Sequence, residues 1–356
     1  MRNPRSVRTT NARFPRRIRR TSGRITMQQV ADLAGVGTMT VSRFFASPEA
    51  VSDGLRARIE RAVQELNYVP NRIAGSLASA RSRAIPVLVP SLANAVYANI
   101  IQGIHDVVVP RGYQLLLANT NFSRAEEENL VATLLGWSPP ALVLTGIDHT
   151  TKTRGLLAAA HLPVVETMEL GRAPIDVNVG FSHREAGRVM TERLIERGYK
   201  CLAFAGARMN QDVRARRRCQ GFLDALRRHG LRTGPVCNFP GPTKYDQGAE
   251  VVEWLSRQRP KVDAVFCHHD VLAVGVLLEC QRRGIAVPGR LAIVGFNGLD
   301  IAAAMRPRLT TVISPRYRIG LETGRLILCR LERGTAERWL DVGFEIAEGE
   351  TTRAAP

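Results

Sequence analysis

A short stretch near the N-terminus gathers side chains suited to contact nucleic-acid bases and phosphates. Thr38, Thr40 and Ser42 carry hydroxyl groups, Arg43 carries a guanidinium fork, and the apolar Met39 lies among them. Hydroxyl and guanidinium groups hydrogen-bond to base edges and phosphates, and apolar side chains contact the thymine methyl group. The spacing puts all five residues on one short helix. The chemistry they predict is recognition of DNA.

The flanking sequence predicts the elements that hold this helix. Thr26 and Gln29 match a capping box at the start of a preceding helix, and Ile25 and Val30 flank it as a hydrophobic staple. The segment 35–37, Gly-Val-Gly, forms a tight turn before the second helix. Two short helices joined by a glycine turn are the layout of a helix-turn-helix, whose second helix fits the major groove. The sequence therefore predicts a sequence-specific DNA-binding domain.

A third helix is expected to close this domain over residues 25–70. It begins at Val51-Ser52, and its apolar residues at helical spacing are Leu55, Ile59, Val63 and Leu66. We expect them to pack against three apolar residues of the first two helices, namely Val30, Leu33 and Val41.

The positive charge is concentrated at the N-terminal end. Residues 1–83 hold sixteen arginines against five acidic residues, a net of +11, and the rest of the chain supplies +7 of the total of +18. Arginines that neutralise phosphates release counterions, so this distribution favours a polyanionic partner. A generally arginine-rich composition is the alternative, because arginine outnumbers lysine 46 to 4.

Residues 1–24 contain nine arginines and no acidic residue. No apolar segment follows, so this is not a secretory signal, and no apolar run approaches the length of a membrane span. We expect a disordered basic arm; an upstream start codon chosen in error and a DNA-contacting arm are the alternatives. The six cysteines are scattered without a C-x-x-C pair, which fits free thiols in a reducing cytoplasm and argues against a disulfide scaffold or zinc site.

Beyond residue 84 the sequence alternates apolar strands with helix-length segments. The expected strands cover residues 85–90, 113–119, 141–146, 163–168, 201–207, 263–268 and 291–297, with a break near 177–181 and a capping box at Ser182 and Glu185. Such alternation predicts parallel sheets covered on both faces, here as two α/β subdomains over residues 84–350. The last elements, at 309–314, 315–333 and 340–346, are expected to cross back between the two subdomains. Ligands bind at the carboxyl ends of such strands, so a cleft between the subdomains is a natural small-molecule site.

Taken together, the two parts resemble the LacI/GalR family of bacterial repressors over residues 25–350. The stretches that carry the resemblance are VADLAGVGTMTVSRFF, LNYVPNRIAGSLAS and AIPVLVPSLANAVYANIIQGI. Within the family the chain is most similar to the gluconate-utilisation repressors, through PSLANAVYANIIQGI, GWSPPALVLT, LPVVETMEL and RLTTVISPRYRIG. The resemblance implies a helix-turn-helix domain, a hinge helix and a core with the periplasmic sugar-binding fold.

The resemblance also assigns roles toward DNA. It places Thr38 and Met39 at base-reading positions, and Arg43, one turn on, can fork to a guanine. Thr26, Thr40 and Ser42 would bond to phosphates, unless Thr40 and Ser42 are ordinary helix surface. The segment 71–83 matches the hinge helix and linker, with Asn71, Arg72, Ala74 and Leu77 at its minor-groove positions. There Leu77 would wedge between base pairs when two chains meet on DNA.

For the core, the resemblance implies an effector pocket. Its positions map onto Ser91, Asn94, Tyr97, Glu166, Arg218, Tyr245, His269 and Asn297. Arg218 has the family's spacing to Phe222 for an arginine that binds ligand. Arg216 or Arg217 would take this role if the register were shifted, and a solvated basic helix face is the alternative without a ligand. Asn297 stands where many members carry an aspartate. The loss of that carboxylate, with an arginine opposite, favours an anionic polyol such as gluconate or a keto- or phospho-relative.

The leading hypothesis is a cytoplasmic, nucleoid-associated repressor that binds a palindromic operator as a homodimer and answers to a sugar acid or its phosphate. No leucine heptad follows Leu340, so we do not expect a tetramer. A neutral sugar effector or a corepressor is the alternative, and a sugar-binding protein or an enzyme is a distant one, since no nucleotide, P-loop or hydrolase motif is present. The neighbouring His268 and His269 lack a third ligand, so no metal is expected, and no cofactor is implied.

Overall fold

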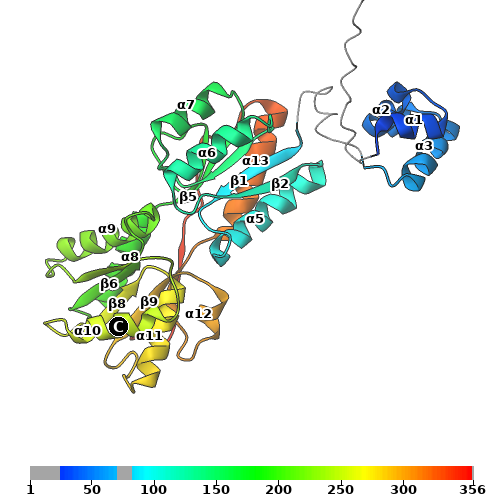
Figure 1. Cartoon of the computed structure of the whole chain (residues 1–356). Coiled ribbons are helices and arrows are strands. Elements are labelled where there is room, and N and C mark those ends of the chain that lie inside the picture. Colours follow the sequence, from blue (N-terminus) through cyan, green and yellow to red (C-terminus); the bar gives the residue numbers. More distant parts are fainter. Residues whose placement is uncertain (1–24, 70–81, 355–356) are drawn as a thin grey trace, which may run out of the picture. The chain divides into compact units, whose positions relative to one another are not determined.

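The computed structural model describes residues 25–69 and 82–354, which belong to two units that divide between Ser79 and Ala80. Figure 1 shows the small helical unit in blue and the larger α/β unit in cyan to red. The expected arm, residues 1–24, lies outside the described residues. So do the four predicted hinge contacts, Asn71, Arg72, Ala74 and Leu77.

The first unit is a helix-turn-helix followed by a third helix, as predicted. Its elements are α1 (Met27–Ala34), α2 (Thr38–Ala46), the short η1 (Pro48–Ala50) and α3 (Asp53–Glu65). The capping box at the start of α1 is present: the backbone N–H of Gln29 donates to Thr26 Oγ1 over 3.3 Å, and that of Thr26 donates to Gln29 Oε1 over 2.8 Å. Gly35 ends α1 in the left-handed conformation (φ 62°), which a side chain would strain.

The core of this unit differs from the prediction at one position. Val30, Val41 and Ile59 are fully buried as expected, but Leu33 is 46% exposed. The buried stripe of α1 consists of Val30, Ala31 and Ala34. With 100° of rotation per residue, Leu33 lies roughly 100° from the centre of that stripe and faces outward. The expectation that Leu33 packs in the core was wrong.

The second unit consists of two α/β lobes, each built on a six-stranded sheet in this part of the chain. The first sheet has the order β11-β5-β4-β3-β1-β2 and is entirely parallel; the second has the order β12-β10-β9-β8-β6-β7, with β12 antiparallel to β10. Two doubly wound, mostly parallel sheets confirm the predicted fold class.

The first lobe carries β1 (Ala84–Val89), β2 (Gln114–Asn119), β3 (Leu142–Thr145), β4 (Val164–Glu169), β5 (Val177–Phe181), β11 (Trp339–Asp341), α5 (Ala95–Val108), η2 (Val109–Arg111), α6 (Arg124–Leu135), α7 (Thr151–Ala159) and α13 (Arg316–Arg333). The second lobe carries β6 (Leu202–Ala207), β7 (Val236–Phe239), β8 (Ala264–Cys267), β9 (Ala292–Asn297), β10 (Thr310–Ile313), β12 (Glu345–Ala347), α8 (His183–Glu196), α9 (Val213–Arg228), α10 (Gln247–Ser256), α11 (Asp270–Arg282) and α12 (Asp300–Ala304).

The chain passes between the lobes after β5, after β10 and after β11. It therefore returns α13 to the first lobe, where this helix packs on α5 (Figure 1). The two helices touch at glycines: a Cβ on Gly103 would lie 2.4 Å from the carbonyl oxygen of Tyr317, and one on Gly320 would lie 2.2 Å from that of Ile100. One hydrophobic cluster contains buried residues of both lobes. In the described part of the chain, no helix is long and apolar enough to span a bilayer.

Candidate functional site

The second helix of the first unit exposes one face and buries the other. Met39, Ser42 and Arg43 are exposed, and Met39 shows 76% of its surface. Val41 and Phe44 on the opposite side are buried in the domain core. On this exposed face Met39 offers an apolar side chain and Arg43 a guanidinium, two groups that contact base edges in a major groove.

Three threonines predicted to contact DNA surround this face. Thr38 and Thr40 are half-buried in the first turn of α2. Thr26 is exposed, but its hydroxyl already serves the capping box with Gln29. Gly37 precedes α2 and offers no side-chain cap, so the first N–H groups of α2 are left for another acceptor, such as a phosphate.

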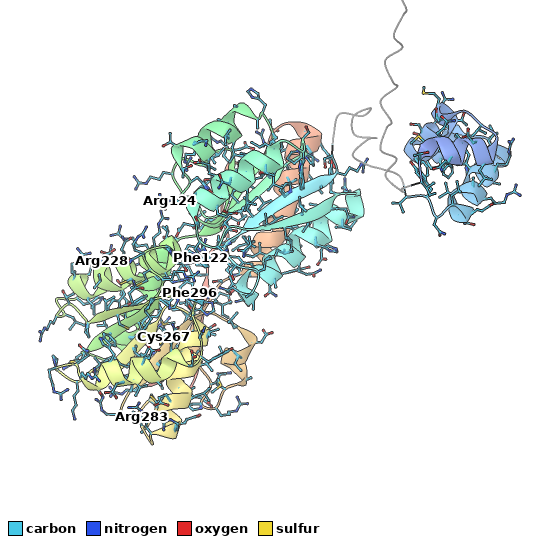
Figure 2. The ribbon with its side chains drawn as sticks, viewed as in Figure 1. Phe122, Arg124, Arg228, Cys267, Arg283 and Phe296 are labelled. Atoms are coloured by element: carbon cyan, nitrogen blue, oxygen red, sulfur yellow. The ribbon has the colours of Figure 1, made fainter. Side chains whose placement is uncertain are left out.

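A cavity of about 400 Å³ lies between the two lobes of the second unit. Its first-lobe wall comes from the residues that follow β1, β2 and β3 and from the last residue of β4; its second-lobe wall comes from residues 210–214 and Arg216 at the start of α9. The strands of the first lobe thus meet it with their carboxyl ends, where open α/β sheets bind ligands. Figure 2 shows Phe122, which lines the cavity, at the junction of the lobes.

Helix α9 is held where its arginines can reach this cavity. It packs on α8 through glycines: a Cβ on Gly187 would lie 2.3 Å from the carbonyl oxygen of Arg218, and one on Gly221 would lie 1.9 Å from that of Arg184. Only glycine permits such backbone contact. The start of α9 is fixed by Asp212, whose carboxylate accepts the N–H groups of Arg214 and Ala215.

Two arginines of the second lobe contact aromatic side chains of the first. Arg214 donates to the hydroxyl of Tyr97 over 2.7 Å, and burial raises the pKa of this tyrosine to about 12, so it stays neutral. The guanidinium of Arg208 lies 5.1 Å from the ring centre of Phe122. The cavity therefore sits beside contacts that join the lobes. The predicted Tyr97 takes part in one of them through Arg214, which lines the cavity.

Arg218 lies deeper than Arg214. It is 4% exposed, its carbon Cζ lies 4.3 Å from the ring centre of Phe296, and its Nη1 donates to His183 Nδ1 over 3.3 Å. His183 donates from Nε2 to the carbonyl oxygen of Met168 over 3.0 Å, which leaves Nδ1 free to accept. Burial lowers the pKa of Arg218 to about 10, so the side chain remains a cation at neutral pH.

The acid that meets the arginines is Glu169, not the predicted Glu166. Glu169 ends β4, lines the cavity and places Oε1 3.2 Å from Arg217 Nη1. Burial raises the pKa of its carboxyl group, although Arg217 opposes the shift. Glu166 is fully buried in mid-strand, where it accepts the N–H of Ile175 and faces α7. Side chains at the carboxyl end of a parallel strand reach ligands, and this rule would have selected Glu169.

The second lobe adds further polar groups near Arg218. His269 caps α11 by accepting the N–H of Val271 at Nδ1, so its proton resides on Nε2. Burial lowers the pKa of His268 to about 3, and the pKa of His269 falls well below its ordinary value for the same reason. Asn297 ends β9 with a left-handed backbone (φ 106°), and its Oδ1 accepts from Ser314 over 3.2 Å.

Several buried polar atoms in this region have no hydrogen-bond partner within the described residues. They are Arg218 Nε, His268 Nδ1, His269 Nε2 and Glu169 Oε2. Burial alone would raise the pKa of Asp212, but Arg214 and Arg218 hold it below its ordinary value. Three arginines thus face two acids, one of which has a raised pKa. Unpaired buried donors beside a cationic cluster are the groups that a polar, anionic ligand would satisfy.

The other predicted effector residues occupy different positions in the fold. Ser91 is half-buried after β1, and Asn94 caps α5 by accepting the N–H of Val96 over 3.0 Å. Tyr245 is 47% exposed ahead of α10. Arg216, one of the register alternatives, lines the cavity and donates to the carbonyl oxygen of Met209. Of the predicted residues, the structure brings Tyr97, Arg218 and His269 close to Asp212. Asn297 follows Phe296, whose ring Arg218 contacts, and Glu166 faces α7 instead.

Two residues of the cluster, Arg214 and Asp212, were not predicted, because neither carries a sequence signal that points to a ligand. Arg214 is one of four arginines in the five residues 214–218, and only its distance from the N-cap of α9 sets it apart. Asp212 carries an N-cap signal, which reads as a local structural role. No group of histidine, cysteine, aspartate or glutamate side chains in the described residues is arranged to hold a metal.

A helix-turn-helix unit joined to a two-lobed ligand-binding core defines a class, the DNA-binding transcriptional regulators. Comparison with known families agrees. Residues 26–71 match the family of bacterial regulatory proteins, lacI family, and residues 191–352 match the periplasmic binding protein-like domain.

Similarity to individual proteins extends over most of the chain. It is 40% identical over 324 residues to the HTH-type transcriptional regulator GntR of Escherichia coli K12, covering 91% of this chain and 97% of that protein. It is 38% identical to GntR of Pseudomonas aeruginosa, covering 94% and 97%. A LacI-family regulator from Silicibacter pomeroyi superposes with a TM-score of 0.87 at 34% identity, covering 92% of this chain and 99% of that one.

The chain therefore belongs to the LacI family of bacterial transcriptional regulators. The relatives are described as transcriptional regulators, which confirms a DNA-binding transcriptional regulator over the enzyme alternative.

Proposed function

We propose that this regulator is a repressor of sugar-acid catabolic genes, with a gluconate-type effector bound in the cavity between the lobes. The observation that carries the proposal is the buried arginine cluster of α9, which faces unpaired polar atoms next to a cavity of about 400 Å³. The similarity to the GntR regulators supports the same class of effector.

A linear polyhydroxy acid matches the groups on both walls. Its carboxylate would pair with Arg214 or Arg218, where a charge-assisted bond in a buried setting is strong. Its hydroxyl groups would donate to the free Oε2 of Glu169 and accept from Nε2 of His269. Asn297, in place of an acid, leaves the net charge of the cluster positive. We propose Glu169 in the role first assigned to Glu166.

A neutral sugar is the second candidate. A solved structure described as a complex of the transcriptional regulator CelR with cellobiose is 29% identical to this chain and superposes with a TM-score of 0.65. Hydroxyl groups could satisfy the unpaired atoms without a carboxylate. In that case one cation of the Arg214 and Arg218 pair would remain unmatched, and we therefore rank this candidate second. Use of the ligand as a corepressor is a further alternative.

We propose that the DNA contacts follow from α2 and the hinge segment. Met39, Ser42 and Arg43 would enter the major groove, and Leu77 of the hinge would wedge into the minor groove. An effector that favours a different arrangement of the lobes would release the hinge from DNA. By linkage, an inducer binds the DNA-free form more tightly by the factor by which it weakens DNA binding.

We propose a homodimer on a palindromic operator, because each helix-turn-helix reads one half-site. The first lobe offers a surface for it. Strand β2 is an edge strand, Leu117 on it is 43% exposed, and Leu92 after β1 is 59% exposed. An unpaired edge with apolar side chains favours contact with a second chain. Such a protein would act in the cytoplasm, at the chromosome.

A thermal-shift screen of the full chain tests the effector. The ligands are sodium gluconate, 6-phosphogluconate, glucose and cellobiose. A gel shift with operator DNA then tests whether each ligand releases the protein from that DNA. We expect gluconate to raise the Tm by mass action and glucose to leave it unchanged. Stabilisation by the neutral sugars alone would contradict the role of Arg214 and Arg218.

A further inference from the structure

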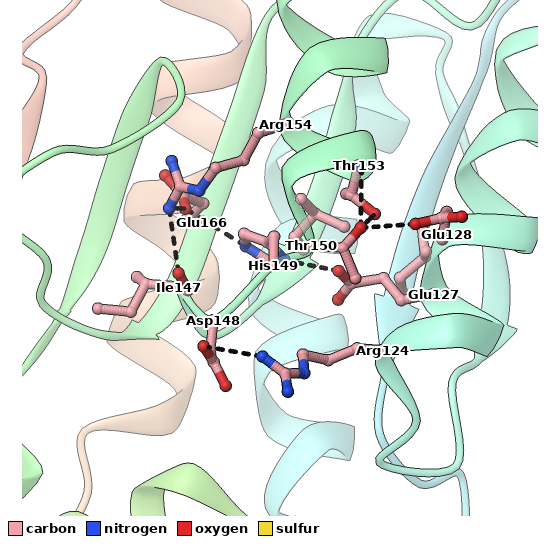
Figure 3. A network of polar contacts seen from close by, with 12 residues as sticks. Arg124, Glu127, Glu128, Ile147, Asp148, His149, Thr150, Thr153, Arg154 and Glu166 are labelled. Atoms are coloured by element: carbon pink, nitrogen blue, oxygen red, sulfur yellow. Dashed lines mark hydrogen bonds and ion pairs between the residues drawn. The ribbon is translucent and has the colours of Figure 1, made fainter.

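A buried histidine next to the cavity has no part in the site described so far. His149 lies between β3 and α7, and its side chain is 1% exposed. Its Nδ1 contacts Glu127 Oε1 on α6 at 2.6 Å, and its Nε2 lies 3.3 Å from Glu166 Oε1 on β4. Figure 3 shows the imidazole between the two carboxylates, one on each side.

The charged groups around His149 come from α6, α7 and β4, and together with the imidazolium their charges balance. Arg154 on α7 lies 3.6 Å from Glu166 Oε1, so two carboxylates face one guanidinium and one imidazole. Burial alone would lower the pKa of His149, but Glu127 and Glu166 raise it to about 9. The imidazole is therefore a cation at neutral pH, and the cluster holds two charges of each sign.

Two further ion pairs flank this cluster on its surface side. Glu128 of α6 accepts from the hydroxyl of Thr150 over 2.7 Å and lies 3.0 Å from the amine of Lys152. Arg124 and Asp148 pair at 3.5 Å where both are largely exposed.

The cluster holds the segment that forms one wall of the cavity. Residues 145–148 line the cavity, and so does Glu127. Arg154 donates from Nη2 to the carbonyl oxygen of Ile147 over 3.1 Å. At the other end of the wall, a Cβ on Gly146 would lie 3.4 Å from Nη1 of Arg214. The wall thus lies between the ion cluster and a guanidinium of the opposite lobe, and both Gly146 and Arg214 line the cavity.

We propose that His149 is a positioning residue of the effector site: clamped between Glu127 and Glu166, it fixes the wall 145–148 against Arg214 and so sets the affinity for the effector without contacting it. The inference rests on the proposed function, because it takes the cavity to be the effector site. If the ion cluster were purely structural, substitution of His149 would lower the stability of the protein and leave the gluconate affinity of the folded protein unchanged.

Calorimetric titration of the full chain with sodium gluconate tests this inference. His149→Gln keeps a polar side chain of similar reach but cannot become a cation. We expect the Kd to rise about tenfold, the size of one lost charge-assisted hydrogen bond. Glu128→Gln is the matched control, because it removes a carboxylate of the same helix that tethers the same loop without contacting His149. Its Kd should stay within about twofold of wild type.

A pH profile separates positioning from folding. In wild type the Kd for gluconate should rise between pH 7.5 and about 9.5 as His149 loses its proton, and H149Q should lack this rise. Affinity for operator DNA without gluconate should be the same in both proteins. If H149Q does not fold, Arg154→Met is the second test. In wild type the partly exposed Arg154 belongs to the ion cluster and donates to the carbonyl oxygen of Ile147 in the wall. We expect the Arg154→Met variant to bind gluconate more weakly as well.

The outcomes separate the two proposals. Tight gluconate binding by H149Q with the wild-type pH profile, or by Arg154→Met where H149Q does not fold, would overturn the positioning role alone. Absence of gluconate binding to the wild type would overturn the proposed sugar-acid effector, and the role of His149 with it.

Discussion

Arg214 of α9 and Tyr97 of α5 are joined across the lobes by a hydrogen bond of 2.7 Å between a guanidinium and a phenolic hydroxyl. Tyr97 is 4% exposed and Arg214 8% exposed. Arg214 also lines the cavity, so a ligand that binds its guanidinium acts on the group that connects the lobes. This contact gives the cavity a direct route to the arrangement of the lobes.

The first prediction concerns this bond. Tyr97→Phe removes the acceptor and leaves a buried guanidinium N–H without a partner. We expect the free energy of unfolding of the core to fall by about 1.5–3 kcal/mol, as for a hydrogen bond to a charged group. Urea denaturation measures it. Tyr245→Phe is the control: its ring is 47% exposed, and the change should stay within about 0.5 kcal/mol.

The second prediction separates two glutamates of the same strand. Glu169→Gln keeps the size of a side chain that ends in the cavity but replaces one acceptor oxygen with an NH2 donor. A gluconate hydroxyl that donates to Oε2 then loses its acceptor, so we expect gluconate affinity to fall about tenfold or more while the fold persists. Glu166→Gln removes a fully buried charge that faces His149 and Arg154, and we expect a loss of stability of about 3 kcal/mol. Calorimetry and urea denaturation of both variants decide. Gluconate binding by Glu169→Gln at wild-type affinity would contradict the assignment of Glu169.

The sequence predicted the fold because its signals are local. The N-caps Thr26 and Ser182 begin the helices expected of them, since each hydroxyl accepts an N–H within one turn. The full capping box is present at Thr26, whereas the carboxylate of Glu185 pairs with Arg188 and leaves the predicted box at Ser182 half formed. Strand β7 was missed because its residues alternate between exposed and half-buried at a sheet edge. The run 340–346 is two strands, β11 and β12, in different sheets, and no local pattern states which sheet a short strand joins.

The site was harder to predict because its residues meet only in three dimensions. Arg218 was found through its spacing to Phe222, which is a sequence property. Glu169 and Glu166 are three residues apart on one strand, and period-two alternation sends them to opposite faces. Glu166 was chosen by resemblance, but the ion cluster around His149 engages it. That cluster joins α6, α7 and β4, and no motif connects those segments.

The third prediction concerns base reading. Arg43→Ala should cost about 1–3 kcal/mol of affinity for the specific operator and relax selectivity at one base pair, because a bidentate contact to guanine is lost. Arg61→Ala is the control; Arg61 is exposed on α3 and donates to the carbonyl oxygen of Ala57 in its own helix. Fluorescence anisotropy with operator and scrambled DNA measures both. A uniform loss on both DNAs for R43A would indicate a phosphate contact instead.

The fourth prediction concerns the hinge segment. Leu77→Ala should weaken binding to the operator far more than binding to non-specific DNA, because a wedge acts only where the duplex is kinked. The measurement is anisotropy at fixed salt with the two DNAs in parallel. Equal losses on the two DNAs would exclude the wedge.

The fifth prediction follows from the raised pKa of His149. The folded protein binds this proton more tightly than the unfolded chain, from the ordinary value of 6.5 to about 9. The resulting stability is complete below pH 6.5 and is lost as the pH rises through 9. A shift of this size corresponds to a contribution on the order of 3 kcal/mol. Urea denaturation of the full chain from pH 6 to 9.5 should show that loss in wild type.

His149→Gln supplies the comparison, because its side chain does not titrate. The difference in free energy of unfolding between wild type and H149Q should shrink as the pH rises from 6.5 to 9.5. Groups with depressed pKa, such as His268, contribute on the acid side, since their stabilisation is lost as the pH falls below 6.5. They do not titrate in the alkaline range, so they leave the difference between wild type and variant unchanged there. A difference that stays constant with pH would mean that Glu127 and Glu166 do not hold His149 as a cation.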